Sequence, residues 1–255
     1  MTHKIELQVV EFLRSVAKEP LEMEEKLMQP AAKDVGHFLE KLYENDPHKP
    51  FTLRLSNVGR PLCQLQMAKK NSAKAESDWF LPLRLMLGGV TEGLTMSILR
   101  HAGVTINEEQ TKVKLPVNTS NGVVEISGTL DLLIDNKVYD IKSASSYSYA
   151  EKFSSYGSLK ASDDFGYLGQ LYSYAKARDV EAGGFIVIDK SSGEIKVVEV
   201  PHNWLEDQEE CLNTIEHNVN VIIDEEAEFK RCFEDKDEII SEEIWFSILI
   251  ISKFK

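Results

Sequence analysis

The sequence predicts an α+β fold in which helical segments enclose a middle region of β-strands. Residues 4–45 carry apolar side chains at helical spacing, which predicts two amphipathic helices before the turn signal DPHKP. Between residues 110 and 142 the apolar period changes to two, which predicts three strands of an antiparallel meander. A helical pattern over 163–178, two strand patterns over 183–200 and an acidic helix from 202 to about 230 complete the expected order.

The composition is that of a packed protein with no apparent membrane segment. The chain has 255 residues, of which 42% are hydrophobic, and this suits one large domain or two small ones. No run of eighteen apolar residues occurs, and the first thirty residues are too charged for a signal peptide. We therefore expect a cytoplasmic protein that does not contact a membrane.

The charge of the chain is unevenly distributed. There are 29 Lys and Arg against 42 Asp and Glu, and the net charge of −13 argues against broad contact with nucleic-acid phosphates. The acids concentrate near the N-terminus and after residue 205, whereas the middle of the chain carries many of the lysines. A local basic surface in the middle of the chain is therefore compatible with the composition.

Glu92 stands out in an apolar segment. Residues 81–99 are apolar almost all round, which predicts a largely buried helix. A carboxylate in that setting needs a cation or a metal as partner, because an isolated buried charge is very costly. The competing interpretation is a structural ion pair between Glu92 and Arg84 or Arg100.

The stretch GTLDLLIDNKVYDIKSAS, residues 128–145, predicts a hairpin with two opposed acids. Asp135 and Asn136 tolerate the positive φ values of a two-residue turn, which sets Asp131 across from Asp140. Like charges so placed destabilise a sheet, and a divalent cation such as Mg²⁺ or Mn²⁺ would offset their repulsion. The alternative is a hairpin whose charges form only surface salt bridges.

Two neighbours of Asp140 complete a possible reaction site. Lys142 lies two residues further on, across from Thr129 and on the same face, within reach of a bound phosphate. Ile141 points to the core, while its carbonyl is available as a further metal ligand. Two acids, a lysine and a metal that lowers the pKa of a water suit the hydrolysis of a phosphodiester.

This arrangement resembles the PD-(D/E)xK nuclease motif. Asp131 is followed after eight residues by Asp140, Ile141 and Lys142, and Leu130 stands at the position of the motif's proline. The order of the two acids and the lysine agrees with that family.

Three further features resemble RecB-type nuclease domains within this family, and the likeness covers residues 55–200. Gly128 and Asp131 match the form GxxD, and Gln170 and Tyr174 match the helix motif QxxxY. Residues 88–92 are similar to the upstream helix that supplies a first ligand, where many relatives have histidine.

The resemblance implies a fold and a set of roles. The fold would be a central mixed β-sheet flanked by helices, a restriction-endonuclease-like core with helical additions at both ends. Lys142 would be the catalytic lysine, and Gln170 and Tyr174 would orient it or contact DNA. The remaining site residues would bind Mg²⁺ or Mn²⁺, namely Glu92, Asp131, Asp140 and the carbonyl of Ile141.

Some RecB-type exonucleases bind an iron–sulfur cluster, and the cysteines here do not fit one. Cys63 stands where the upstream cysteine ligand would be, but no trio of cysteines follows it, since Cys211 and Cys232 are far apart. We therefore expect no cluster and a reduced, buried Cys63.

The expected function is that of a metal-dependent deoxyribonuclease. The resemblance favours an exonuclease acting on single- or double-stranded DNA ends in recombination, repair or replication, and a homo-oligomer around DNA is compatible with it. The alternatives are an endonuclease, a catalytically silent module that binds DNA ends, and an interaction protein built on the acidic helices. We expect one compact domain, made of an N-terminal helical region packed on the core (1–50), a nuclease core (51–200) and an acidic C-terminal helical region (201–255).

Overall fold

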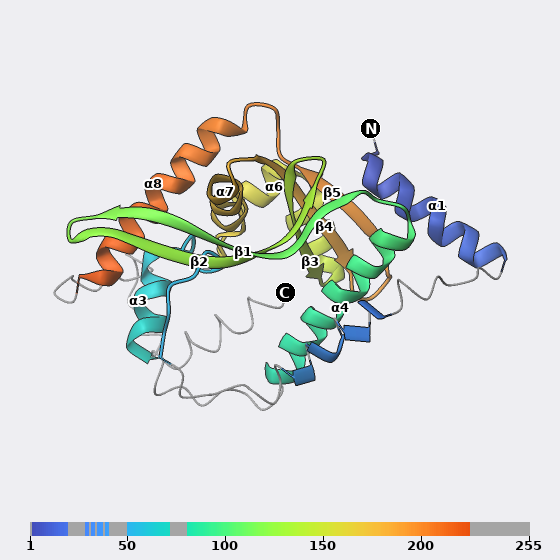
Figure 1. Ribbon diagram of the computed structural model, residues 1–255, viewed down its shortest axis with the longest axis horizontal. Coiled ribbons are helices and arrows are strands. Elements are labelled where there is room, and N and C mark those ends of the chain that lie inside the picture. The colour runs from blue at the N-terminus through green and yellow to red at the C-terminus, as the bar shows by residue number, and fades with distance from the viewer. Residues whose placement is uncertain are drawn as a thin grey trace.

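A five-stranded β-sheet forms the centre of the computed structural model, which describes residues 2–19, 29–30, 32–33, 35–37, 39–40, 50–71 and 81–224 (Figure 1). The strands lie in the order β1-β2-β3-β4-β5. They are β1 (Ile106–Thr119), β2 (Gly122–Ile134), β3 (Lys137–Ala144), β4 (Glu181–Asp189) and β5 (Ile195–Glu199). The β3–β4 pair is parallel and the other three pairs are antiparallel. The expected mixed sheet is therefore confirmed.

Helices cover both faces of this sheet, so the predicted α+β class is also confirmed. The crossover from β3 to β4 runs through four short elements, as a parallel pair requires. The helices are α1 (Lys4–Lys18), α3 (Leu62–Asn71), α4 (Leu81–His101), α5 (Ser146–Ala150), the 3-10 turn η1 (Lys152–Ser154), α6 (Tyr156–Ala161), α7 (Tyr167–Arg178) and α8 (Trp204–Ile223).

Two apolar cores hold the helices on the sheet. On one face, Tyr172 of α7 and Ile215 of α8 pack with Phe185 of β4. On the other face, Val9 of α1 and Leu99 of α4 pack with strand residues of the sheet centre. The sheet is thus the middle layer of three, and a side chain on β3 faces α7 or α4 according to its parity.

The β1–β2 hairpin extends well beyond the other strands (Figure 1). Its long ribbon reaches toward α8, where Ser120 N donates a hydrogen bond of 2.9 Å to Asn220 Oδ1. The carbonyl of Asn118 accepts a second bond from the same side chain, at 3.2 Å. The far end of the hairpin is therefore fixed on α8.

The predicted β2–β3 turn and register are confirmed near the turn. Asp135 and Asn136 have φ values of 49° and 61°, the left-handed pair of a tight hairpin. Three residue pairs follow in the expected register, ending at Leu132 and Tyr139. Beyond that point β2 and β3 diverge, because β3 continues along β4 while β2 continues along β1.

Two sequence-based expectations are wrong. The first half of α4 is exposed, with Leu83, Leu85 and Leu87 each about half accessible, because only the second half of the helix packs on the sheet and α1. Cys63 on α3 is half-buried and disulfide-bonded, whereas Cys211 carries a free thiol.

Several expectations fall outside the described residues. The second N-terminal helix is described only in part, at residues that are helical between 29 and 40, and the acidic C-terminal helix is confirmed as far as Ile223. The division into three regions stays a prediction. None of the described helices is long and apolar enough to cross a membrane.

Candidate active site

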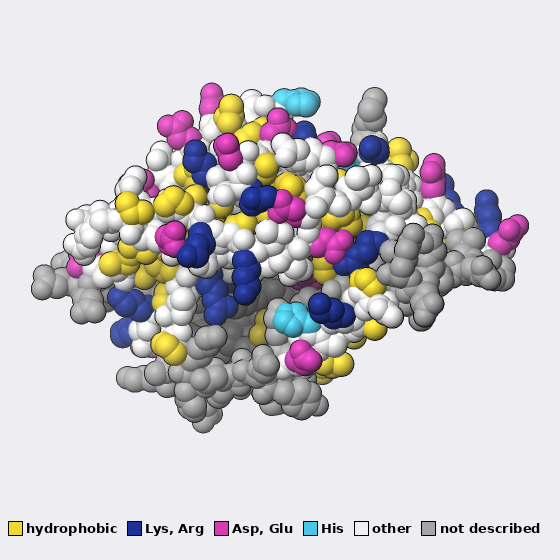
Figure 2. All heavy atoms as spheres, viewed as in Figure 1, with side chains coloured by type: hydrophobic (Ala, Val, Ile, Leu, Met, Phe, Trp, Pro, Cys, Tyr) yellow, Lys and Arg dark blue, Asp and Glu magenta, His cyan; other side chains and the backbone are white. Residues whose placement is uncertain are grey.

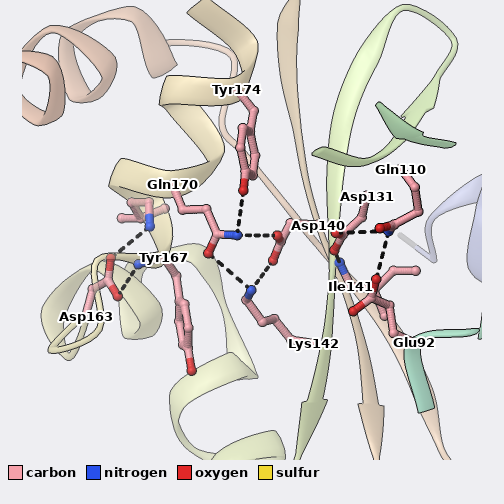
Figure 3. A network of polar contacts seen from close by, with 11 residues as sticks. Glu92, Gln110, Asp131, Asp140, Ile141, Lys142, Asp163, Tyr167, Gln170 and Tyr174 are labelled. Atoms are coloured by element: carbon pink, nitrogen blue, oxygen red, sulfur yellow. Dashed lines mark hydrogen bonds and ion pairs between the residues drawn. The ribbon is translucent and has the colours of Figure 1, made fainter. Parts of the chain in front are cut away.

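Asp140 and Lys142 form a buried ion pair on β3, facing α7 (Figure 3). Only 1% of the Asp140 side chain and 17% of the Lys142 side chain are exposed. Gln170 of α7 binds both partners, since its Nε2 donates to Asp140 Oδ1 at 3.0 Å and its Oε1 accepts from Lys142 Nζ at 3.4 Å. One amide therefore fixes the positions of the carboxylate and the ammonium.

Tyr174 supports this amide from the next turn of α7. Its hydroxyl accepts a hydrogen bond of 3.3 Å from Gln170 Nε2, and only 1% of the residue is exposed. The ring lies against Gly128, where an added Cβ would come within 2.7 Å of Tyr174 Cε1. The glycine of the GxxD pattern thus leaves the space that Tyr174 fills. Gln170 and Tyr174 belong to the buried face of α7, not to a polar surface stripe.

The start of α7 is fixed by a side-chain cap and a close backbone contact. The carboxylate of Asp163 accepts hydrogen bonds from the N–H groups of Tyr167 and Leu168, at 2.9 and 2.8 Å. Gly166 has φ 69°, and a Cβ there would lie 2.3 Å from the backbone of Gly59. These local constraints set the height of α7 over β3, and therefore the place of Gln170.

Asp131 lies on β2 beside the point where β2 and β3 diverge. Its Oδ2 accepts a hydrogen bond of 2.9 Å from the backbone N–H of Ile141. The carboxylate thus accepts from a backbone N–H that would otherwise donate to a carbonyl of the neighbouring strand. The expected direct opposition of Asp131 to Asp140, and of Thr129 to Lys142, is replaced by this side-chain contact, since strand pairing stops one step earlier.

Glu92 and Gln110 complete the site on the side of α4. Gln110 Nε2 donates to Glu92 Oε1 at 2.8 Å and to Asp131 Oδ1 at 3.5 Å (Figure 3). Arg100, one of the two arginines considered for Glu92, forms an ion pair with Glu109, which lies next to Gln110 on β1. The structure thus places Glu92 near Asp131, and their role as metal ligands stays a prediction.

The site disfavours the charged form of Asp131 and favours the charged form of Lys142. Burial, followed by the negative charges of Asp140 and Glu92, raises the pKa of Asp131 well above its usual range. Burial lowers the pKa of Lys142, but the carboxylates, Asp140 above all, outweigh it and leave that pKa above its usual value. Lys142 is therefore an ammonium at neutral pH, and negative charge is in excess around Asp131.

A cleft of about 270 Å³ opens beside these residues. It is bordered by the second half of β3, the exposed half of α4 and the segment from α5 to α7. Four of its lining residues are cationic and one is acidic, namely Arg84, Lys142, Lys152, Lys190 and Glu92. Lys152 Nζ lies 4.6 Å from the ring centre of Phe165 and 5.1 Å from that of Tyr167, so one wall is both aromatic and positive.

On the face shown in Figure 2, Lys and Arg side chains are interspersed with Asp and Glu side chains across the middle of the molecule. The local basic surface that the sequence allowed stays a prediction.

Glu92, Asp131 and Asp140 carry the oxygen donors that a divalent cation prefers, but they do not converge on one point. Glu92 and Asp131 share one neutral amide donor, and Asp140 Oδ2 accepts no well-directed hydrogen bond, although it contacts the Lys142 ammonium. Among the described residues no three acidic, histidine or cysteine side chains converge on one point. The reason is visible in Figure 3, where Asp140 turns to Lys142 while Asp131 turns to Ile141 and Gln110. Cation binding would therefore require these side chains to reorient.

Sequence reasoning singled out neither Gln110 nor Lys190. They belong to no motif, because tertiary contacts alone bring them to the site. In the structure, Gln110 has a left-handed φ of 46°. Such a value is uncommon outside glycine.

Comparisons with known proteins add little. No protein-family model matches the sequence, and no curated protein matches it significantly. A crystal structure of SSO0001 is similar to the chain with a TM-score of 0.44 and 16% identity, over 74% of this chain and 84% of that one.

Proposed function

We propose that this chain is a Mg²⁺- or Mn²⁺-dependent deoxyribonuclease that hydrolyses phosphodiester bonds from DNA ends. The observation that carries the proposal is the contrast within one small site. Asp131 lies close to two further carboxylates, Asp140 and Glu92, while a protonated Lys142 is held by Asp140 and Gln170. A metal ion and a phosphate require this combination of charges side by side.

The metal would be held by Glu92, Asp131 and Asp140, with the Ile141 carbonyl as a further ligand. When bound, it would lower the pKa of a water and polarise the phosphate. Lys142 does not act as a base, because its raised pKa keeps it protonated. Its ammonium instead donates to a phosphate oxygen and stabilises the charge that develops there.

Gln170 and Tyr174 act as positioning residues. Gln170 holds the ammonium of Lys142 and the carboxylate of Asp140 with opposite ends of one amide. Tyr174 is too deeply buried to contact DNA, which favours the role of orienting the site among the two roles that the family resemblance implies. Gln170 and Tyr174 therefore hold the Lys142 side chain in position before substrate binds.

The cleft supports a nucleic-acid substrate held over a small area. Arg84, Lys152 and Lys190 place positive charge beside Lys142, whereas the chain as a whole has a net charge of −13. The preference for ends over internal sites rests on the resemblance to RecB-type domains. The rival functions are an endonuclease and a silent module that binds DNA ends.

The test is digestion of end-labelled linear duplex, linear single-stranded and closed circular DNA in Mg²⁺, Mn²⁺ or EDTA. Wild type is compared with Asp131→Asn and with Glu125→Gln, which removes an exposed carboxylate from the same strand. We expect metal-dependent loss of linear DNA only, strongly reduced in Asp131→Asn at the metal concentration that half-saturates wild type and unchanged in Glu125→Gln. Cleavage of circles would support the endonuclease, and end binding without cleavage would support the silent module.

A further inference from the structure

We propose that the side chain of Gln110 is a placeholder for the metal ion, occupying the space between Glu92 and Asp131 until a cation displaces it. This inference rests on the proposed metal-dependent function. It gives a role to a residue that belongs to none of the motifs of the site.

The first observation is the position of the amide. Gln110 Nε2 is 2.8 Å from Glu92 Oε1 and 3.5 Å from Asp131 Oδ1, so one nitrogen donates to both acids. A metal ion bound between Glu92 and Asp131 at the place of this nitrogen would contact the same two oxygens. The amide and the cation therefore compete for the same acceptors.

The second observation is the backbone of β1. Glu109 pairs with Leu132 and Thr111 with Leu130, which leaves Gln110 beside Asp131 between these two pairs. Gln110 itself is not part of the regular ladder, and its φ of 46° turns its side chain toward the acids (Figure 3). A left-handed conformation at a residue with a side chain is uncommon and often occurs at functional sites.

The third observation is that the amide is weakly held. Gln110 is exposed and carries no net charge, so its donor groups offset the repulsion of the acids only in part. A doubly charged ion interacts far more strongly with the same oxygens. The side chain can leave toward solvent without disturbing either core.

The placeholder role predicts a linkage that a purely structural residue would not produce. If the amide binds the acids only in the metal-free protein, removing it destabilises that state alone. The metal-bound state is unaffected, so the affinity for metal must increase by the same factor by which the metal-free fold is weakened.

The experiment combines Mn²⁺ titration by calorimetry with thermal unfolding, using Gln110→Ala and Gln110→Met. The methionine variant keeps the length of the side chain and removes only its hydrogen bonds. The control is Gln8→Ala on α1, which removes a half-buried glutamine that donates to Gly103 O instead of to an acid.

We expect both Gln110 variants to bind Mn²⁺ about threefold to tenfold more tightly than wild type. Their melting temperature should be lower than that of wild type in EDTA and equal to it in saturating Mn²⁺. Gln8→Ala should change neither the affinity nor the difference between the two conditions.

Unchanged or weaker Mn²⁺ binding by the Gln110 variants, while wild type binds Mn²⁺, would overturn the placeholder role and leave the proposed function standing. Wild-type protein that binds no Mn²⁺ would instead overturn the proposed function, and the placeholder role with it.

Discussion

Asp140 and Asp131 come from adjacent strands of one sheet, yet their surroundings differ. Asp140 is buried against a protonated lysine and an amide, which together neutralise and orient it. Asp131 is half-buried beside Glu92, and its donors are one backbone N–H and one shared amide. The difference teaches that the two acids of the motif are not equivalent. We therefore divide the site into two halves, one around Asp131 and one around Lys142. We assign the cation mainly to the Asp131 half and the phosphate to the Lys142 half.

The sharpest test of this division is Lys142→Met. Because the ammonium faces the phosphate and not the metal, we expect turnover to fall at least about a hundredfold while Mn²⁺ affinity changes less than about threefold. Cleavage kinetics measure the turnover, and calorimetry measures the Mn²⁺ affinity. Lys137→Met, at the other end of β3, is the control, since it also removes an ion-paired lysine. Equal loss of turnover and of metal binding would mean that the two halves are one unit.

Asp140→Ala should weaken the fold of the metal-free protein. It leaves the Lys142 ammonium buried without its carboxylate, and breaking a buried pair in this way costs about 3–5 kcal/mol. Denaturant unfolding in EDTA measures the change, with Glu125→Ala as an exposed control. A gain in stability would instead mean that repulsion between Asp131 and Asp140 outweighs the ion pair.

Asp131→Asn should have the opposite effect, and the effect should depend on pH. The pKa of Asp131 is raised in the folded state, so folding favours its protonated form, and the stability that it contributes is lost as pH rises through that folded value. The stability of Asp131→Asn minus that of wild type, measured in EDTA, should therefore increase as pH rises from about 4. The difference should level off above the folded pKa. A difference that shrinks with rising pH would contradict the assigned environment of Asp131.

The smallest expected effect belongs to Lys190→Met at the edge of the cleft. An exposed lysine that contacts one phosphate should lower DNA affinity by a few fold and reduce the slope of log Kd against log salt by about one. Titration of a labelled strand in EDTA at several salt concentrations measures both quantities. Lys4→Met on α1 is the control, and the same loss in that variant would mean that binding follows overall charge, not the cleft.

Local chemistry made much of this site predictable. The Asp135-Asn136 turn needs two residues that tolerate positive φ, and once that turn is placed, alternation puts Asp140 and Lys142 on one face and Ile141 in the core. Gln170 and Tyr174 are one helical turn apart, so their shared face was also predictable.

The remaining features depend on tertiary contacts. The divergence of β2 and β3 at Asp131 follows from how each strand pairs on its other side, which no periodicity records. The exposed first half of α4 was missed because an apolar sequence does not reveal how far a helix extends past the sheet. Gln110 was missed because its conformation, and not its residue type, brings it to the acids.

The most direct test of the division between the two halves is the rate of DNA cleavage as a function of Mn²⁺ concentration. We predict that Asp131→Asn raises the half-saturating Mn²⁺ concentration at least about tenfold, while Lys142→Met lowers the maximal rate at an unchanged half-saturating concentration. A wild-type rate that is the same in EDTA, or two variants that respond to Mn²⁺ in the same way, would contradict the account.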